Sequence, residues 1–81
     1  MARALAPQNI RVNAIEPGAV MTDRQRRLWY PTAESVDAVL ARQLLQRPLL
    51  GSDIADAAMF LASDAARMIT RQVLVVDAGV S

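Results

Sequence analysis

The chain has 81 residues, with nine arginines, eight acidic residues and a formal net charge of +1 at pH 7. It contains no cysteine, no histidine and no lysine. These absences exclude disulfides, zinc sites built from Cys or His, a Cys nucleophile, a His general base and a lysine Schiff base. No metal site is therefore expected.

The length allows one small domain, and a hydrophobic content of 53% is too high for a disordered tail. No apolar run approaches the roughly 20 residues of a membrane span, and residues 1–6 are too short for the apolar part of a signal peptide. The near-neutral charge gives no case for a nucleic-acid partner. We therefore expect a cytoplasmic chain with neither a membrane nor a nucleic acid as its partner.

The first half of the chain predicts one strand. Residues 1–6 are strong helix formers, and Pro7 is expected to stop a helix whose beginning is absent. Residues 10–15 alternate in hydropathy and carry β-branched side chains, which predicts a strand ended by Pro17-Gly18. Residues 19–31 are expected to be irregular.

The second half predicts two helices and a strand. Thr32 can cap a helix over about 33–46, and Ser52 can cap a second helix over about 53–63. Residues 73–76 form a continuous apolar run, which indicates a strand buried on both faces of a parallel sheet.

This order of elements predicts an α/β fold with one βαβ crossover, in which two helices join two parallel strands. Two strands alone are marginally stable in water. A strand that is apolar on both faces needs layers that this chain does not supply. We therefore expect part of a larger α/β domain.

Three stretches of the chain, residues 9–22, 47–64 and 68–79, resemble the short-chain dehydrogenase/reductase family. The first holds the IRVN strand, the PG turn and the following Thr22. The third holds ITRQ and VDAG where the family usually has ITGQ and VDGG, so Arg71 and Ala78 stand in place of glycines. The likeness covers nearly all 81 residues.

The resemblance implies that residues 1–81 are the C-terminal part of a single NAD(P)-binding, Rossmann-like domain: its last βαβ crossover. The implied reaction is hydride transfer between an alcohol or sugar carbon and the nicotinamide of NAD or NADP. The family's Gly-rich turn and its Tyr-x-x-x-Lys motif do not occur here. Tyr30 follows the PG turn, so no catalytic residue is assigned. We expect no activity, and weak or no cofactor binding, from this chain alone.

The resemblance places four cofactor-binding positions in the loop after the first strand: Pro17, Gly18, Val20 and Thr22. In the family this loop contacts the nicotinamide carboxamide through backbone groups and a threonine hydroxyl. Two alternatives stay open, because most Pro-Gly pairs are ordinary turns and Thr22 can instead be bonded locally.

Residues 21–29 resemble the substrate loop of family members that oxidise aldose sugars. Arg24, Gln25 and Trp29 would serve a polyol through hydrogen bonds and a stacking face. The alternative is a solvated loop.

A second function of a different class is a stand-alone oligomerisation or interaction module derived from this fold. It would associate with itself or with a full-length relative. The unpaired edge of the 10–15 strand and the apolar helix faces motivate this hypothesis. A third interpretation is a degraded remnant without a function.

Overall fold

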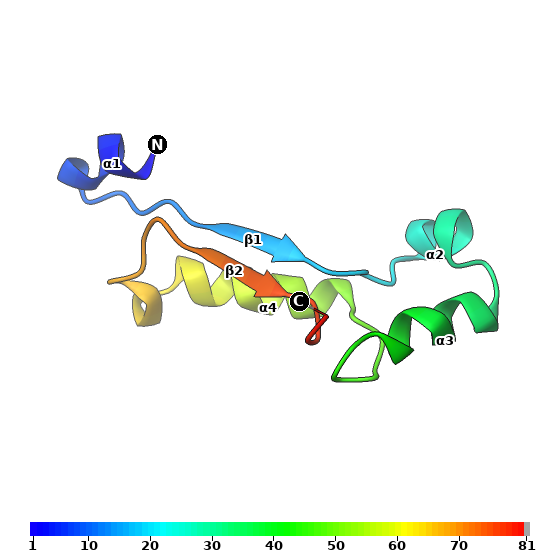
Figure 1. Cartoon of the computed structure of the whole chain (residues 1–81). Coiled ribbons are helices and arrows are strands. Elements are labelled where there is room, and N and C mark those ends of the chain that lie inside the picture. Colours follow the sequence, from blue (N-terminus) through cyan, green and yellow to red (C-terminus); the bar gives the residue numbers. More distant parts are fainter. Residues whose placement is uncertain (81) are drawn as a thin grey trace.

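The computed structural model describes residues 1–80 and is elongated, with principal extents of 50 × 23 × 18 Å (Figure 1). The helices and strands, in chain order, are α1 (Ala2–Leu5), β1 (Ala14–Pro17), α2 (Asp23–Trp29), α3 (Ala33–Ala41), α4 (Gly51–Ala62) and β2 (Val73–Val76). Short 3₁₀ turns, η1 (Ala6–Gln8) and η2 (Asp64–Ala66), follow α1 and α4.

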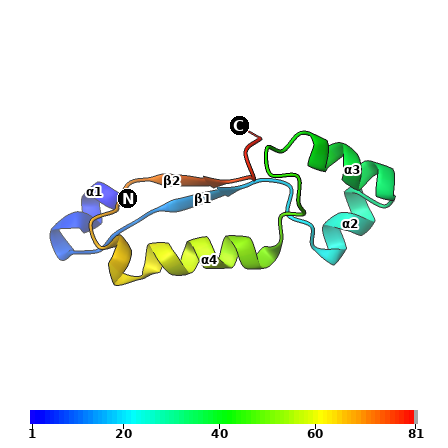
Figure 2. The same cartoon turned by 90° about the horizontal axis from the view of Figure 1, so that it is seen from below.

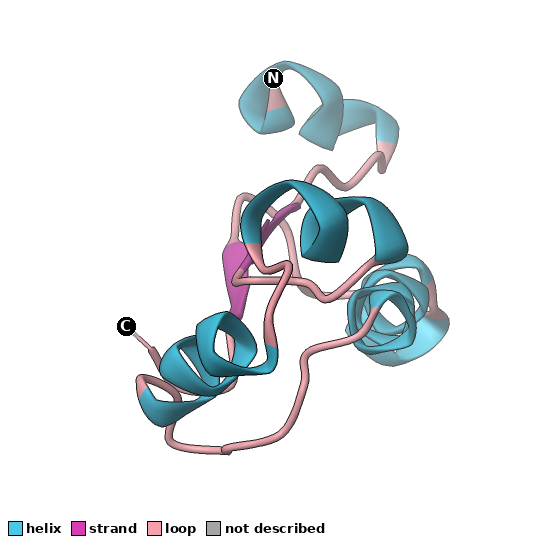
Figure 3. Cartoon of the chain, turned by 90° about the vertical axis from the view of Figure 1, so that its right-hand side faces the viewer, coloured by secondary structure: helices cyan, strands magenta, loops and turns pink. Residues whose placement is uncertain are grey.

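The two strands pair in parallel, with Ala14 opposite Val73 and Pro17 opposite Val76. Helix α4 returns along one face of this pair (Figure 2). Helices α2 and α3 lie beyond the carboxyl ends of the strands, in front of them when the molecule is viewed from that end (Figure 3). The predicted α/β class and the parallel crossover are confirmed.

The strand predicted over 10–15 instead begins at Ala14 and includes Pro17. Ahead of it, the Val12 amide donates to the Thr70 hydroxyl at 3.1 Å rather than to a backbone carbonyl. This side-chain partner interrupts the regular ladder before Ala14. Pro17 is tolerated because a proline at the end of a strand need not donate to the ladder.

Asn13 fixes the turn that leads into β2. Its side-chain Nδ2 donates to the Ile69 carbonyl at 3.0 Å, and its Oδ1 accepts from the Gln72 amide at 3.1 Å. Arg11 Nη1 also donates to the Ile69 carbonyl, at 3.1 Å. These side chains tie the entry of β1 to the entry of β2.

The expectation that residues 19–31 are irregular is wrong, because they include α2. Thr22 caps this helix: its Oγ1 accepts from the Gln25 amide at 3.2 Å. A cap of this kind satisfies one of the free amides at a helix start, which makes a short helix possible.

Thr32 caps α3 as predicted, with its Oγ1 accepting from the Ser35 amide at 3.1 Å. The helix ends at Ala41 rather than near residue 46. Gln43 accounts for the early end. Its side chain is 2% exposed, and its Nε2 donates at 2.9 Å to the carbonyls of both Leu45 and Arg47. These bonds hold a compact loop in place of further helical turns.

Helix α4 is capped by Leu50 and Asp53, not by Ser52. The Leu50 amide donates to Asp53 Oδ2 at 2.8 Å, and the Asp53 amide donates to the Leu50 carbonyl at 3.0 Å. The carboxylate also lies in the first turn, where the helix dipole favours a negative charge.

The apolar core of the described residues is small. Met21, Leu49 and Ala66 are its buried members. Residues 73–76 are not buried on both faces in this chain, since Val73, Leu74 and Val75 are 62%, 37% and 45% exposed. This exposure agrees with the expectation that the chain does not supply the layers that would cover both faces. Helix α4 covers one face of the strand pair, and no described element covers the other.

Two non-glycine residues at the ends of β2 have a left-handed backbone. Arg71 has φ of 60° and Ala78 has φ of 57°; Gly79 follows with φ of 89°. Side chains disfavour this region, whereas glycine adopts it without steric cost. The two positions where the family resemblance expects glycine are therefore positions that require a left-handed backbone.

Candidate functional site

The loop after β1 lies at the carboxyl ends of both strands, which is the edge where open α/β sheets bind ligands (Figure 1). The Gly18 amide donates to the Val76 carbonyl at 2.9 Å, and the Met21 amide donates to the Leu49 carbonyl at 2.7 Å. These two bonds tie the loop to β2 and to the segment before α4. The loop is thus held at both of its ends.

Gly18 lies against the backbone of Asp77. A Cβ built on Gly18 would lie 2.7 Å from the Asp77 Cβ and 2.8 Å from its Cα. Neither atom can rotate away, so a side chain at this position would push the strand ends apart. The glycine is needed for this packing, whether or not a ligand also approaches it.

Two successive amides of the loop are left without an acceptor. Among residues 1–80, the backbone N–H groups of Ala19 and Val20 donate no hydrogen bond, although both residues are half-buried. An amide that has no acceptor within the protein is available to an added one. The carbonyl oxygen of a carboxamide would be a suitable one.

Thr22 is bonded locally, because its Oγ1 accepts from the Gln25 amide. A hydroxyl carries one proton and two lone pairs, so capping uses one lone pair and leaves the proton for another acceptor. Capping and a ligand contact are therefore compatible at this residue.

Arg24, Gln25 and Trp29 all lie on α2 and are exposed, Trp29 by 67%. None of the three lines a pocket beside the loop after β1. Their assignment to a substrate loop stays a prediction.

A pocket of about 310 Å³ lies between the loop after β1 and α3, and we call it the turn pocket. Its lining residues are Glu16, Pro17, Gly18, Ala19, Tyr30, Val39, Arg42, Val75, Asp77 and Val80. Sequence reasoning missed Tyr30 and Arg42. The sequence did indicate the position of Arg42, because it follows Val39 of the apolar stripe by three residues and so shares its helix face. For Tyr30 we see no comparable signal.

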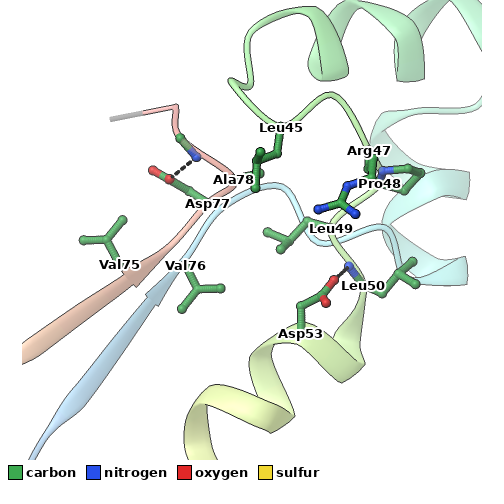
Figure 4. A pocket seen from close by; sticks show the side chains of 11 residues that line it. Leu45, Arg47, Pro48, Leu49, Leu50, Asp53, Val75, Val76, Asp77 and Ala78 are labelled. Atoms are coloured by element: carbon green, nitrogen blue, oxygen red, sulfur yellow. Dashed lines mark hydrogen bonds between the residues drawn. The ribbon is translucent and has the colours of Figure 1, made fainter.

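A larger open pocket of about 930 Å³ runs along β2, and we call it the β2 pocket (Figure 4). Its lining residues are Leu45, Arg47, Pro48, Leu49, Leu50, Asp53, Val75, Val76, Asp77, Ala78 and Gly79. The Leu45 amide donates to the Ala78 carbonyl at 2.9 Å, and Asp77 Oδ1 accepts from the Gly79 amide at 2.9 Å. The first bond fixes the loop after α3 against the end of β2, and the second holds the turn that follows β2.

Among the residues that the structure describes, no group of three or more acidic side chains could hold a metal ion. Within the same range, no helix is long and apolar enough to cross a membrane.

Comparisons with known proteins agree with this fold. The family model for enoyl-(acyl carrier protein) reductase matches residues 1–81. A probable galactose dehydrogenase of Rhizobium meliloti is 48% identical over 80 residues, which are 99% of this chain and 31% of the relative. The 7alpha-hydroxysteroid dehydrogenase of Escherichia coli is 40% identical over 79 residues, which are 98% of this chain and 30% of the relative.

Among solved structures, a 4-hydroxyisoleucine dehydrogenase complexed with NADH matches all of this chain and 33% of its own, with a TM-score of 0.88 and 33% identity. Fold and loop thus define a segment of a Rossmann-type α/β domain. The chain belongs to the short-chain dehydrogenase/reductase family. It spans about a third of the length of the curated relatives it matches.

Proposed function

We propose that this chain is the C-terminal part of a cytoplasmic, NAD(P)-dependent short-chain oxidoreductase and supplies the nicotinamide side of its active site. The observation that carries the proposal is the pair of unpaired amides at Ala19 and Val20, at the carboxyl ends of the strands. The Val20 amide and the Thr22 hydroxyl would donate to the carboxamide of the cofactor. Pro17 and Gly18 would set the path of the backbone toward it.

Bound NAD or NADP would supply the hydride acceptor. The Gly-rich turn, the catalytic Tyr and its Lys are not in these 81 residues, so the rest of a complete domain would have to provide them. The residues of this chain bind and orient, and none of them is assigned a proton transfer.

We infer that the substrate is an alcohol of the aldose-sugar class. An aldose sugar is the substrate class in the name of the probable galactose dehydrogenase, which is 48% identical to this chain. Arg24, Gln25 and Trp29 would contact such a substrate if α2 closes over it.

A chimera tests the cofactor proposal. The 81 residues replace the matching third of the Rhizobium meliloti relative, whose remainder completes the domain. The readout is NADH binding, followed by nucleotide fluorescence. We expect the chimera to bind NADH and Thr22→Val to weaken binding roughly tenfold, because a hydrogen bond to the carboxamide is lost. Thr22→Ser keeps the hydroxyl and is the matched control. A folded chimera that does not bind NADH would contradict the proposal.

A second candidate is association through the uncovered apolar surface. Met59, Phe60, Val73 and Val75 are 71%, 44%, 62% and 45% exposed, so both α4 and β2 present apolar side chains to solvent. A surface of this kind favours a second copy of the chain or a full-length relative.

The association candidate predicts a thermal unfolding midpoint that rises with chain concentration, because dimers are favoured by mass action. Circular dichroism of the isolated chain over a range of concentrations measures it. A cooperative transition at one fixed temperature, from a monomer, would count against association.

A further inference from the structure

Three polar side chains of the turn pocket have no partner among residues 1–80. They are the carboxylate of Glu16, the hydroxyl of Tyr30 and the guanidinium of Arg42, which come from β1, from the end of α2 and from the end of α3. Among residues 1–80 none of the three side chains makes a hydrogen bond or an ion pair. Glu16 and Arg42 therefore line one pocket with opposite charges and stay too far apart to pair.

The floor of the turn pocket is the same loop to which we assign the nicotinamide contact. Pro17, Gly18 and Ala19 line it, and the unpaired Ala19 amide belongs to this floor. A molecule in this pocket would lie against the nicotinamide side of the site. That is the position that a hydride donor must occupy.

The chemistry of the lining discriminates between classes of substrate. One cation, Arg42, faces the carboxylates of Glu16 and Asp77, so the pocket has no excess of positive charge for a carboxylate or phosphate substrate. Glu16 and Arg42 are exposed, and a rigid apolar substrate lying over them would remove water from both charges without giving either a partner, which is costly. A neutral molecule with several hydroxyls suits the lining, because each hydroxyl both donates and accepts.

We propose that Glu16, Tyr30 and Arg42 recognise the hydroxyls of a neutral, polyhydroxylated substrate and set the specificity of this site. Glu16 accepts from one hydroxyl, Arg42 donates to another, and Tyr30 serves either direction. Val39, Val75 and Val80 provide an apolar surface for the C–H groups of the same molecule. This proposal rests on the proposed function, since it places the substrate beside the nicotinamide loop.

The test uses the chimera with D-galactose as the probe. Arg42→Gln and Glu16→Gln each raise the KM for galactose roughly tenfold, since each replaces a charged hydrogen-bonding partner by a weaker, neutral one. Tyr30→Phe raises it severalfold. Arg3→Gln, on α1 at the far end of the molecule, leaves it unchanged (Figure 1). NADH binding stays the same in all four variants, because none of these side chains belongs to the cofactor loop.

The two proposals fail in different ways. A chimera that binds NADH and oxidises galactose, with a KM that none of the three pocket substitutions changes, overturns the specificity proposal and leaves the proposed function standing. A folded chimera that neither binds NADH nor oxidises an alcohol overturns the proposed function, and the specificity proposal fails with it.

Discussion

Replacing Gly18 by alanine should destabilise the junction between the two strands. The added Cβ would lie 2.7 Å from the Asp77 Cβ and 2.8 Å from its Cα. Carbon atoms in contact prefer about 3.5–4.0 Å, so the gap must widen by roughly 1 Å. Both Asp77 atoms are fixed by the backbone, so the strand ends must separate and stretch the 2.9 Å bond from the Gly18 amide to the Val76 carbonyl.

Overpacking of this kind costs about 1–3 kcal/mol. In a domain of about 150–250 residues each kcal/mol lowers the melting temperature by about 2–4 °C. For the chimera, which completes the domain, we therefore expect Gly18→Ala to lower the melting temperature by roughly 2–12 °C. Thermal unfolding followed by circular dichroism measures this shift.

Gly51→Ala is the matched control, because it makes the same chemical change where space is open. A Cβ on Gly51 meets nothing within 4 Å, and the residue is the first of α4. Alanine is the better helix former, so this substitution should be neutral or stabilising by up to about 1 kcal/mol. A Gly18→Ala chimera that melts with its parent, or a Gly51→Ala chimera that loses as much, would refute the reasoning.

The remaining stability predictions use the same melting assay. Arg71→Gly and Ala78→Gly should each stabilise the chimera by up to about 1 kcal/mol. A residue with a side chain loses about 1–2 kcal/mol in the left-handed backbone, and glycine avoids this loss. Part of the benefit is offset because glycine raises the conformational entropy of the unfolded chain. Lower melting temperatures would contradict that account. Asn13→Ala should cost about 1–3 kcal/mol, since it removes the bonds to Ile69 and Gln72. An unchanged melting temperature would mean that the hydrogen bonds of the Asn13 side chain do not contribute to stability. Thr22→Val should lower the free energy of unfolding by about 0.5–2 kcal/mol, because α2 loses its cap, whereas Thr22→Ser should leave it unchanged. Equal losses of stability in the two variants would mean that packing, and not the cap, causes the effect.

Hydrophobic pattern was enough to predict the parallel crossover, because periodicity reports which faces of α4 and β2 are apolar. It could not predict where β1 begins. That boundary depends on the bond from the Val12 amide to the Thr70 hydroxyl, which joins residues 58 positions apart. Helix α2 was missed for a related reason: it has seven residues and depends on the cap at Thr22 more than on an apolar stripe.

One part of the candidate site could likewise be predicted from the sequence, and another part could not. The loop at Pro17 and Gly18 could be located from sequence, because the turn residues and their neighbours are contiguous. The turn pocket could not, since Glu16, Tyr30 and Arg42 line one pocket only once α2 and α3 lie beyond the carboxyl end of β1. The exposure of β2 agrees with the sequence pattern, because a strand that is apolar on both faces needs covering layers that these 81 residues do not supply.

The central claim is that this chain completes the active site of a nicotinamide-dependent oxidoreductase. The most direct test is the rate of NADH formation from NAD and galactose, compared between the chimera, the 81-residue chain and the truncated relative alone. The account predicts activity in the chimera and none in either part. A chimera that folds, binds NADH and forms no NADH with galactose or any other alcohol would contradict it.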